Sequence, residues 1–314
     1  DRMTPPYRIP SMEAIRAIPH NTYKVISTFS GCGGSSLGYK MAGFRVLWAS
    51  EFVKAAQDTY RANFPDTILD TRDIRDITPQ DILSTLALQP GELDLLDGSP
   101  PCASFSAAGN GAKDWGKVKS YSDTHQQTDD LFFEFIRLLR GLRPKVFVAE
   151  NVRGLITGKA KGYFLNILNK FKQSEYRVSC RVLDAQWLGV PQVRRRVIFI
   201  GVRNDLAIDP VHPKPLPYRY TLRDILPTTS EPRGPEWKQV IGTCLDAEWD
   251  KLHQGEQSIK YFNCIKPDLD KPCPTILAAG GGSSSGIHPV EKRKFSIREL
   301  KLICGFPDDF QLPE

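Results

Sequence analysis

A cysteine and a glutamate end two of the apolar runs in this sequence. Cys102 follows the run that ends at Asp97, after two prolines, and Glu150 closes the run that begins at Lys145. If both runs are neighbouring parallel strands, they end at one edge of a sheet, where ligands of such folds bind. A thiol there can attack a carbon, and a carboxyl group can assist by sharing a proton. The pair therefore predicts nucleophilic catalysis, against the alternatives of an inert buried cysteine and a solvated acid.

A glycine-rich turn, Phe-Ser-Gly-Cys-Gly-Gly-Ser-Ser-Leu-Gly at 29–38, follows the first apolar run, and Glu51 ends the next one. Glycines let the backbone approach a ligand at a helix N-terminus, and the acid can accept hydrogen bonds from ribose hydroxyls. Asp73 and Ile74 come later, where an acid and an apolar residue can hold an adenine. The turn is neither a Walker loop nor a strict dinucleotide fingerprint. We predict a nucleotide-type pocket; a plain tight turn and a surface acid are the alternatives.

Basic residues cluster in two further places. Alternation along the strand expected at 197–202 places Arg194 and Arg196 on one face, although exposed surface arginines would read the same way. The polar stretch 103–128 carries three lysines against one aspartate between positions 110 and 120. We expect this stretch to lack secondary structure, and structureless loops of this length inside compact domains are typically lids or disordered segments. A basic lid suits a polyanionic substrate.

The elements that must position these residues alternate along the first two-thirds of the chain. Apolar, β-rich runs lie at 23–29, 44–49, 93–97, 145–150, 176–183 and 197–202, and helical patterns lie at 34–42, 129–142 and 163–173. Such alternation predicts an α/β fold with a doubly wound, Rossmann-like sheet. The last two strands are close enough in sequence to form an antiparallel pair.

The sequence pattern changes after residue 202: prolines become frequent, and apolar residues no longer recur with the period of a helix or a strand. We therefore expect a first domain at 1–202 and a smaller, irregular domain at 203–314. A final helix is expected at about 296–304. Ser296 is its N-cap, Glu299 the capping-box partner and Gly305 the terminator.

Composition limits the class of protein. The 314 residues are 40% apolar and 25% charged, which is typical of a globular chain and excludes disorder. No apolar run approaches the roughly 18 residues of a membrane helix, and no secretory signal is visible, so we expect a cytoplasmic protein. The seven cysteines show no Cys-x-x-Cys spacing, which argues against disulfides and a bound metal. The net charge of +6 permits an acidic partner without requiring one.

In family order, these motifs resemble those of the DNA (cytosine-5)-methyltransferases over about residues 23–312. The most specific are Gly-Ser-Pro-Pro-Cys ending at Cys102, Glu-Asn-Val from Glu150, and Gln-x-Arg-x-Arg from Gln192. The resemblance implies a methyltransferase sheet at 1–202, a target recognition region at about 203–285 and a supporting helix at 296–304. It also implies S-adenosyl-L-methionine as methyl donor, S-adenosyl-L-homocysteine as product, and no metal.

The family motifs assign roles residue by residue. The implied catalytic residues are Cys102, Glu150, Arg194 and Arg196; the implied donor-binding residues are Phe29, Ser30, Gly31, Gly33, Gly34, Leu37, Glu51, Asp73, Ile74, Pro100 and Leu131; the implied DNA-binding residues are Ser104, Lys113, Lys117, Lys119, Gln192, Thr275, Gly280 and Gly281.

The implied reaction methylates C5 of a cytosine flipped out of a specific double-stranded DNA sequence, through a covalent bond between Cys102 and C6. Double-stranded DNA is then the partner of a monomer that needs no membrane and that associates with the nucleoid in a prokaryote. Whether a cognate restriction endonuclease exists stays an open question. The alternatives are a transfer-RNA methyltransferase of the same family and a catalytically silent regulatory homologue. Members of the family end with a returning segment that this sequence does not show before Glu314, so we expect the donor pocket to be open on that side.

Overall fold

The computed structural model describes residues 4–101, 118–121, 124–127, 130–157, 160–227, 240–261, 264–277 and 286–313, with the backbone alone for 118–121 and 124–127. The chain forms two compact units. We call Met12–Leu183, Arg195–His212 and Gln311–Glu314 the sheet unit, and Asp1–Ser11, Asp184–Arg194 and Pro213–Phe310 the small unit. Each unit is described by itself.

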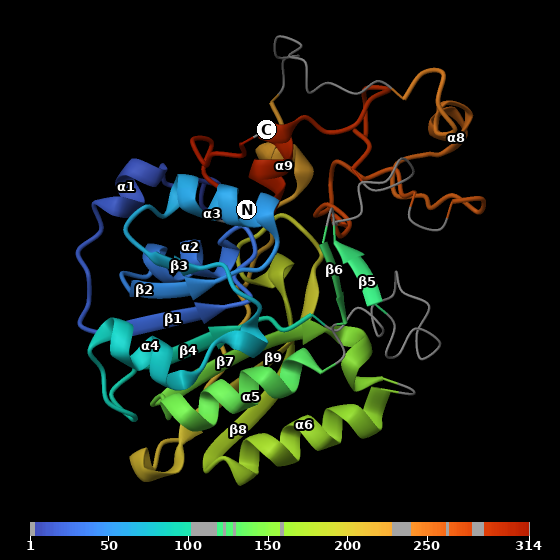
Figure 1. The fold of residues 1–314 in the computed structure, drawn as a ribbon. Coiled ribbons are helices and arrows are strands. Elements are labelled where there is room, and N and C mark those ends of the chain that lie inside the picture. The colour runs from blue at the N-terminus through green and yellow to red at the C-terminus, as the bar shows by residue number, and fades with distance from the viewer. Residues whose placement is uncertain are drawn as a thin grey trace. The chain divides into compact units, whose positions relative to one another are not determined.

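The sheet unit is built on a seven-stranded sheet in the order β3-β2-β1-β4-β7-β9-β8 (Figure 1). The strands are β1 (Lys24–Thr28), β2 (Arg45–Ser50), β3 (Ile68–Asp70), β4 (Leu95–Gly98), β7 (Val146–Val152), β8 (Tyr176–Asp184) and β9 (Arg195–Arg203). The pairs β1–β2, β2–β3, β1–β4 and β4–β7 are parallel, whereas β9 runs antiparallel to β7. This topology confirms the predicted doubly wound α/β fold with antiparallel pairing at its end.

The helices of this unit are α1 (Met12–Arg16), α2 (Gly34–Met41), α3 (Lys54–Asn63), α4 (Pro79–Leu86), α5 (Leu131–Leu142) and α6 (Lys161–Gln173), with a short 3-10 turn η1 (Ile74–Asp76). Helix α4 begins with a complete capping box between Thr78 and Asp81 and with proline at its first position. Helix α5 buries a stripe of leucine and phenylalanine. Strand β3 and helices α3 and α4 are additions to the elements named from the sequence.

Strand alternation directs α2 and α5 to opposite faces of the sheet. A Cβ at Gly98 would collide with the ring of Phe135 on α5, whereas Asp97, the neighbouring residue, is hydrogen-bonded by Tyr39 of α2. Helix α5 packs against both α4 and α6, as Figure 1 also shows.

An aromatic cluster forms the core between the sheet and the layer of α5 and α6. Phe171 of α6 contacts Phe132, Phe135, Phe147 and Phe199, with ring centroids 4.4 to 6.2 Å apart. All five side chains are nearly fully buried. Burial of each such side chain stabilises the fold by roughly 1.5–3 kcal/mol, so this layer is the rigid base of the unit.

The stretch expected to be a lid contains a hairpin in its described part. Strands β5 (Val118–Tyr121) and β6 (Thr124–Gln127) pair antiparallel. The expectation of a stretch without secondary structure is therefore wrong for these residues. The sequence of these two strands is mostly polar, so apolar periodicity did not indicate them.

The small unit has little regular structure. Its helices are α7 (Leu222–Ile225), α8 (Asp246–Lys251) and α9 (Ile297–Cys304), with a 3-10 turn η6 (Ala185–Trp187). Helix α9 has the predicted caps, a capping box between Ser296 and Glu299 and a left-handed Gly305. Near the N-terminus, Tyr7 donates to the carbonyl of Leu302, 2.6 Å away, and packs on Tyr220.

The compact units differ from the single domain boundary expected after residue 202. Residues 184–194, between β8 and β9, belong to the small unit because their backbone pairs with a distant segment. Val193 N donates to Cys273 O over 2.8 Å, and Cys273 N donates to Pro191 O over 2.9 Å. Conversely, 311–314 belong to the sheet unit, where Gln311 exchanges two hydrogen bonds with Asn63 of α3. Sequence texture does not reveal such long-range pairing.

Candidate active site

Strands β1 and β4 are joined by side-chain hydrogen bonds where they end. The hydroxyl of Thr28 donates to the carbonyl of Asp97 over 2.9 Å, and the hydroxyl of Ser99 donates to the carbonyl of Phe29 over 3.2 Å. Both hydroxyls bridge neighbouring parallel strands. The glycine turn after β1 and the Pro-Pro segment after β4 therefore leave the sheet side by side.

Cys102 lies outside the described residues, but the segment that leads to it is held in place. The amide of Asn151 on β7 donates to the carbonyl of Pro100 over 3.0 Å, and Asn151 is 3% exposed. A buried amide that loses its acceptor is costly, so this bond ties the exit of β4 to β7. The residue next to Asn151 is Glu150, so the acid and the segment before Cys102 share one edge, as predicted.

Glu150 forms an ion pair with Arg196 of the neighbouring strand β9. The Nε of Arg196 lies 2.9 Å from Oε1 of Glu150, with side chains 22% and 34% exposed. Residues 152 and 196 are directly opposite in the β7–β9 register, so the pair is diagonal on one face. This carboxylate and guanidinium present hydrogen-bond acceptors and donors at the edge of the sheet.

Arg194 does not share a strand face with Arg196, contrary to the expectation from alternation. Strand β9 begins at Arg195, and Arg194 belongs to the small unit. Its backbone N–H donates to Asp184, and its guanidinium donates to the carbonyl of Ile276 over 3.3 Å. These contacts hold Arg194 in the segment between β8 and β9, outside either strand.

The glycine turn after β1 keeps space in front of its backbone. Gly31 and Gly33 have positive φ values of 54° and 97°. A Cβ at Gly33 would lie 2.1 Å from the ring of Phe64, whereas a Cβ at Gly31 would meet no atom of the described residues within 4 Å. Gly33 also caps α2, whose first N–H groups have no acceptor inside the helix. The residues present thus fit a ligand that approaches Gly31 and the start of α2.

Glu51 already braces this turn. Its Oε2 accepts from the N–H of Gly31 over 2.7 Å, and its Oε1 accepts from the N–H of Val53 over 2.8 Å. A carboxylate has about four acceptor sites, so each oxygen can accept a further hydrogen bond from ribose hydroxyls. The ribose contact of Glu51 stays a prediction, with acceptor capacity left on the carboxylate.

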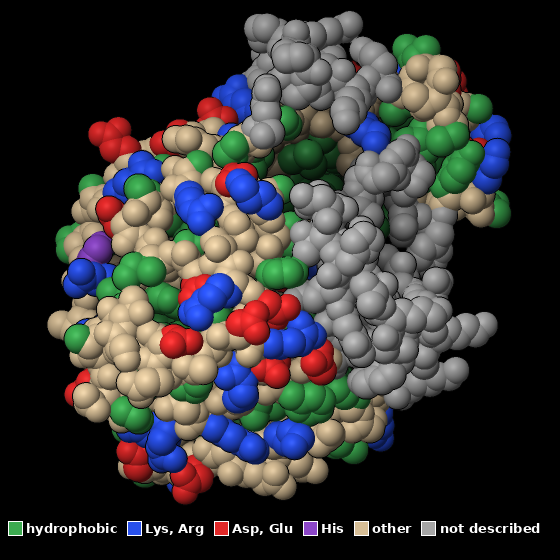
Figure 2. Space-filling model, in the orientation of Figure 1, with side chains coloured by type: hydrophobic (Ala, Val, Ile, Leu, Met, Phe, Trp, Pro, Cys, Tyr) green, Lys and Arg blue, Asp and Glu red, His purple; other side chains and the backbone are tan. Residues whose placement is uncertain are grey.

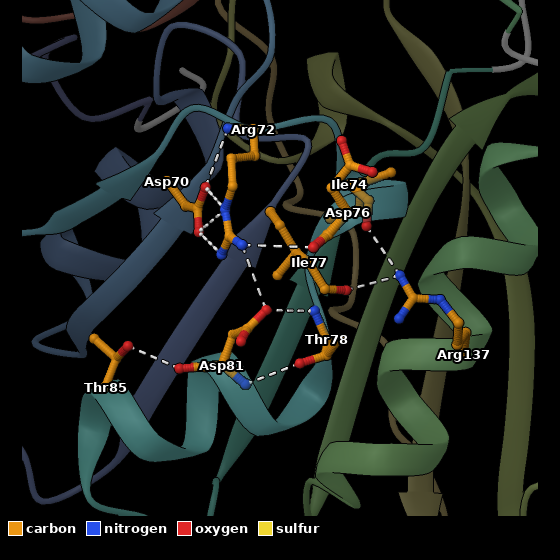
Figure 3. A network of polar contacts seen from close by, with 9 residues as sticks. All are labelled: Asp70, Arg72, Ile74, Asp76, Ile77, Thr78, Asp81, Thr85 and Arg137. Atoms are coloured by element: carbon orange, nitrogen blue, oxygen red, sulfur yellow. Dashed lines mark hydrogen bonds and ion pairs between the residues drawn. The ribbon is translucent and has the colours of Figure 1, made fainter.

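The segment of Asp73 and Ile74 is held by arginines that the sequence analysis did not single out. Arg137 on α5 donates to the carbonyls of Ile74 and Ile77, both over 2.9 Å (Figure 3). Arg75 joins the carboxylates of Asp73 and Asp130. An arginine between two backbone carbonyls of a 3-10 turn fixes that turn, and no sequence pattern signals such a contact. The signal available was an arginine on the core-facing helix α5.

The other predicted donor-binding residues lie in or near this edge. Ser30 donates to the carbonyl of Ser27, Gly34 begins α2, and Pro100 is buried. Leu37, Ile74 and Leu131 are 3%, 5% and 1% exposed, and Phe29 packs beside the main core. Because these apolar side chains are mostly buried, any contact with a ligand is made by the few atoms that stay accessible, and their donor-binding role stays a prediction.

Two predicted DNA contacts have other partners in the small unit. Gln192 is 2% exposed, accepts from the N–H of Ile276 and donates to the sulfur of Cys304. Thr275 donates its hydroxyl to the carbonyl of Val193 over 2.5 Å. The amide of Gln192 thus holds two segments of the small unit together, and its DNA contact stays a prediction.

The remaining predicted DNA contacts, Ser104, Lys113, Lys117, Gly280 and Gly281, lie outside the described residues, and for Lys119 only the backbone is described. The face drawn in Figure 2 mixes acidic and basic side chains where it is described. In the part of the chain that the structure describes, no group of His, Cys, Asp and Glu could hold a metal ion. Over the same residues, no helix is long and apolar enough to cross a membrane.

Comparisons with known proteins place these motifs in context. The family described as C-5 cytosine-specific DNA methylase matches residues 23–314. Type II methyltransferase M.NgoPII of Neisseria gonorrhoeae is 32% identical, over 93% of this chain and 87% of the relative. Type II methyltransferase M.NgoFVII of the same organism is 31% identical, over 93% and 79%.

Solved structures share the fold. A putative DNA modification methyltransferase encoded within an E. coli prophage superposes with a TM-score of 0.69 at 24% identity, over 92% of this chain and 90% of the other. A DNMT2 variant from Spodoptera frugiperda superposes with a TM-score of 0.66 at 21% identity, over 93% and 91%. At these identities the likeness concerns the fold alone, and it agrees with the sheet described above.

Proposed function

Since this chain belongs to the C-5 cytosine-specific DNA methylase family, we propose that it methylates C5 of a cytosine flipped out of a specific duplex DNA sequence, through a covalent bond between Cys102 and C6. The membership confirms the resemblance and the enzyme class expected from the motifs. The methyl donor, the adduct and the residue roles are the finer proposal.

One observation carries the proposal: the Glu150–Arg196 pair lies at the edge where Asn151 holds the carbonyl of Pro100. The thiolate of Cys102 attacks C6, and the electrons displaced toward N3 need an acid or hydrogen-bond donor there. Glu150 supplies this hydrogen bond when it carries a proton. The enamine then becomes nucleophilic at C5, which takes up the methyl group, and loss of the C5 proton expels the thiolate.

Two arginines complete the proposed base pocket. Arg196 fixes the rotamer of Glu150 through the 2.9 Å contact between Nε and Oε1. Arg196 therefore sets the position of the carboxyl group. A cytosine that binds Glu150 has to share the carboxyl group with Arg196 or displace Arg196 from it. For Arg194 we propose the catalytic role that the family motif implies.

The donor pocket lies on the glycine turn. S-adenosylmethionine, when bound, supplies an electrophilic methyl group on a positively charged sulfur. Gly31 leaves room for the backbone approach, Glu51 accepts from the ribose hydroxyls, and Asp73 with Ile74 faces the adenine. Arg137 positions the adenine segment from α5.

DNA contacts are proposed on charge and on family resemblance. Lys113, Lys117 and Lys119 contact phosphates, with Ser104, Thr275, Gly280 and Gly281 nearer the target bases. Flipping a base costs a few kcal/mol, which these contacts help to offset. Each true phosphate contact should contribute about 0.9 to the slope of log affinity against log salt. Residues 203–285 read the target sequence.

The setting follows from the relatives' names. Because similar proteins are named Type II methyltransferases, we propose a restriction-modification system with a cognate endonuclease. The enzyme acts as a monomer, in the cytoplasm and close to the nucleoid of a prokaryote.

A mechanism-based trap tests the proposal. Duplex DNA with 5-fluorocytosine at the target should become covalently attached to Cys102 in the presence of the donor, because fluorine cannot leave as a proton does. Sequencing methylated DNA from an expressing host identifies the target first. Denaturing electrophoresis and peptide mass spectrometry then locate the adduct.

Cys102→Ser is the matched control, since the hydroxyl is far less nucleophilic than a thiolate and should give neither adduct nor methylation while the chain still binds donor and DNA. A tenth of wild-type turnover in Cys102→Ser would exclude the covalent mechanism. Trapping on RNA alone would favour the transfer-RNA alternative. Absence of turnover with either nucleic acid would favour a silent homologue.

A further inference from the structure

One buried acid at the carboxyl edge has no part in the reaction proposed above. Asp97 lies on β4, five residues before Cys102, and is 5% exposed. The hydroxyl of Ser27 donates to its Oδ2 over 2.9 Å, and the phenol of Tyr39 donates to its Oδ1 over 3.0 Å. The carboxyl group therefore joins three elements: β1, β4 and helix α2.

The same hydrogen-bond network reaches the glycine turn. Ser30 donates to the carbonyl of Ser27 over 2.9 Å, and its hydroxyl lies 3.2 Å from the hydroxyl of Ser27. Asp97 is thus two hydrogen bonds away from a residue of the proposed donor-binding turn. Tyr39 belongs to α2, the helix that follows the glycine turn. The Asp97 carboxyl group is thus linked to the glycine turn through Ser27 and to helix α2 through Tyr39.

The charge state of Asp97 is sensitive to its surroundings. Burial raises the pKa of Asp97 to about 7; hydrogen bonds from Ser27, Tyr39 and Ser35 oppose this, and the nearby charge of Glu150 adds to it. Burial and the adjacent acid also raise the pKa of Tyr39 well above its usual value, so its phenol stays protonated. Burial raises the pKa of Tyr60 on α3, and the charge of Asp97 adds to this rise.

We propose that Asp97 is a positioning residue of the methyl-donor site whose negative charge favours the cationic donor over the neutral product. The inference rests on the proposed function. In the transfer, the bond between sulfur and the methyl carbon breaks and the C5–methyl bond forms; the sulfur keeps the electron pair and becomes a neutral thioether. A buried anion near the turn attracts the sulfonium, and this attraction ends with the transfer. Asp97 then promotes exchange of product for donor.

A linked proton makes the proposal measurable. Because a nearby cation favours the ionised acid, donor binding should lower the pKa of Asp97 and release part of a proton near pH 7. A lowering by about one unit would raise the ratio of donor affinity to product affinity by up to about tenfold between pH 6 and pH 8. Product binding should release fewer protons.

Calorimetry tests this on the full chain. S-adenosylmethionine and S-adenosylhomocysteine are titrated separately at pH 6, 7 and 8, in buffers of different ionisation enthalpy to count protons. Asp97→Asn keeps the shape and cannot ionise, so its affinity ratio should show no such rise beyond the titration of the ligands themselves, which is common to all variants. Tyr39→Phe should weaken donor binding about threefold and move the pH dependence to higher pH without abolishing it, because the acid can still ionise but loses a hydrogen bond that lowers its pKa.

Asp94→Asn is the matched control, an acid-to-amide change just before the same strand. Asp94 accepts from Lys24 N and from Lys145 Nζ, away from the glycine turn. It should behave as wild type in the ratio and in proton release. If Asp97→Asn keeps the wild-type pH dependence, the inference is overturned while the proposed function stands. If the wild-type chain binds neither ligand, the proposed function itself fails.

Discussion

The sheet unit packs a large cluster of aromatic and aliphatic side chains around Phe171, whereas the small unit gathers its apolar residues in smaller clusters around Phe295 and Leu245. In the small unit a buried ion pair joins Arg293 to Glu299, 4% and 8% exposed, over 2.8 Å. One unit thus depends mainly on non-directional burial, and the other depends more on placed polar contacts. A unit of the second kind should be more sensitive to substitutions that remove one partner of a buried pair.

The largest effect is expected in the aromatic core. Phe171→Ala should lower the free energy of unfolding of the sheet unit by about 3–5 kcal/mol, because the fully buried ring leaves a cavity among four other phenylalanines. Urea unfolding followed by circular dichroism measures it. A loss below about 1 kcal/mol would contradict a sheet unit stabilised by burial.

The next effect concerns the buried ion pair. Glu299→Gln should destabilise the small unit by about 3 kcal/mol, since it removes the buried one of the two carboxylates that pair with the guanidinium of Arg293, the other being the more exposed Glu291. The control is Asp270→Asn, which breaks the exposed pair with Arg223 and should leave stability unchanged. Hydrogen exchange read peptide by peptide distinguishes the units. Equal effects of the two substitutions would remove the contrast between the units.

The two units should respond to pH in opposite directions. Burial lowers the pKa of His288 to about 4, with Arg293 adding to this, so the small unit loses stability as pH falls from about 6.5 toward 4. Burial raises the pKa of Asp97 to about 7, so the sheet unit loses stability as pH rises from about 4 to 7. Each change should be about 3 kcal/mol.

Hydrogen exchange at pH 5 and pH 7, corrected for intrinsic rates, tests this contrast. Asp97→Asn should remove the pH dependence of the sheet unit and leave that of the small unit intact. Parallel pH trends in both units of the wild-type chain would show that other groups dominate.

The smallest effect on stability is expected at the glycine turn. Gly31→Ala should cost about 1–2 kcal/mol, the penalty of a side chain at φ 54°, and should weaken donor binding at least tenfold by filling the open cradle. Gly33→Ala should cost more, because its Cβ meets the ring of Phe64. Thermal melts with calorimetric donor titration compare them. If Gly31→Ala binds donor as wild type does, the cradle does not hold it.

Local patterns were sufficient for the alternating part of the fold. The apolar stripe of α5, the capping box of Ser296 and Glu299, and the β-rich runs indicated elements that the structure contains, because their hydrogen bonds and burial depend on neighbours in sequence. The motif order likewise indicated the family that the comparison confirms.

Other features depend on residues far apart in the sequence, and only the tertiary structure decided them. Gln192 is buried between Ile276 and Cys304, Arg137 holds the carbonyls of a turn about sixty residues away, and Asp97 meets Ser27 and Tyr39. The division into units follows the same kind of contact, since the segment 184–194 pairs with Cys273. A polar side chain has no periodicity that indicates its partner, so its role is decided when packing brings the distant donor and acceptor together.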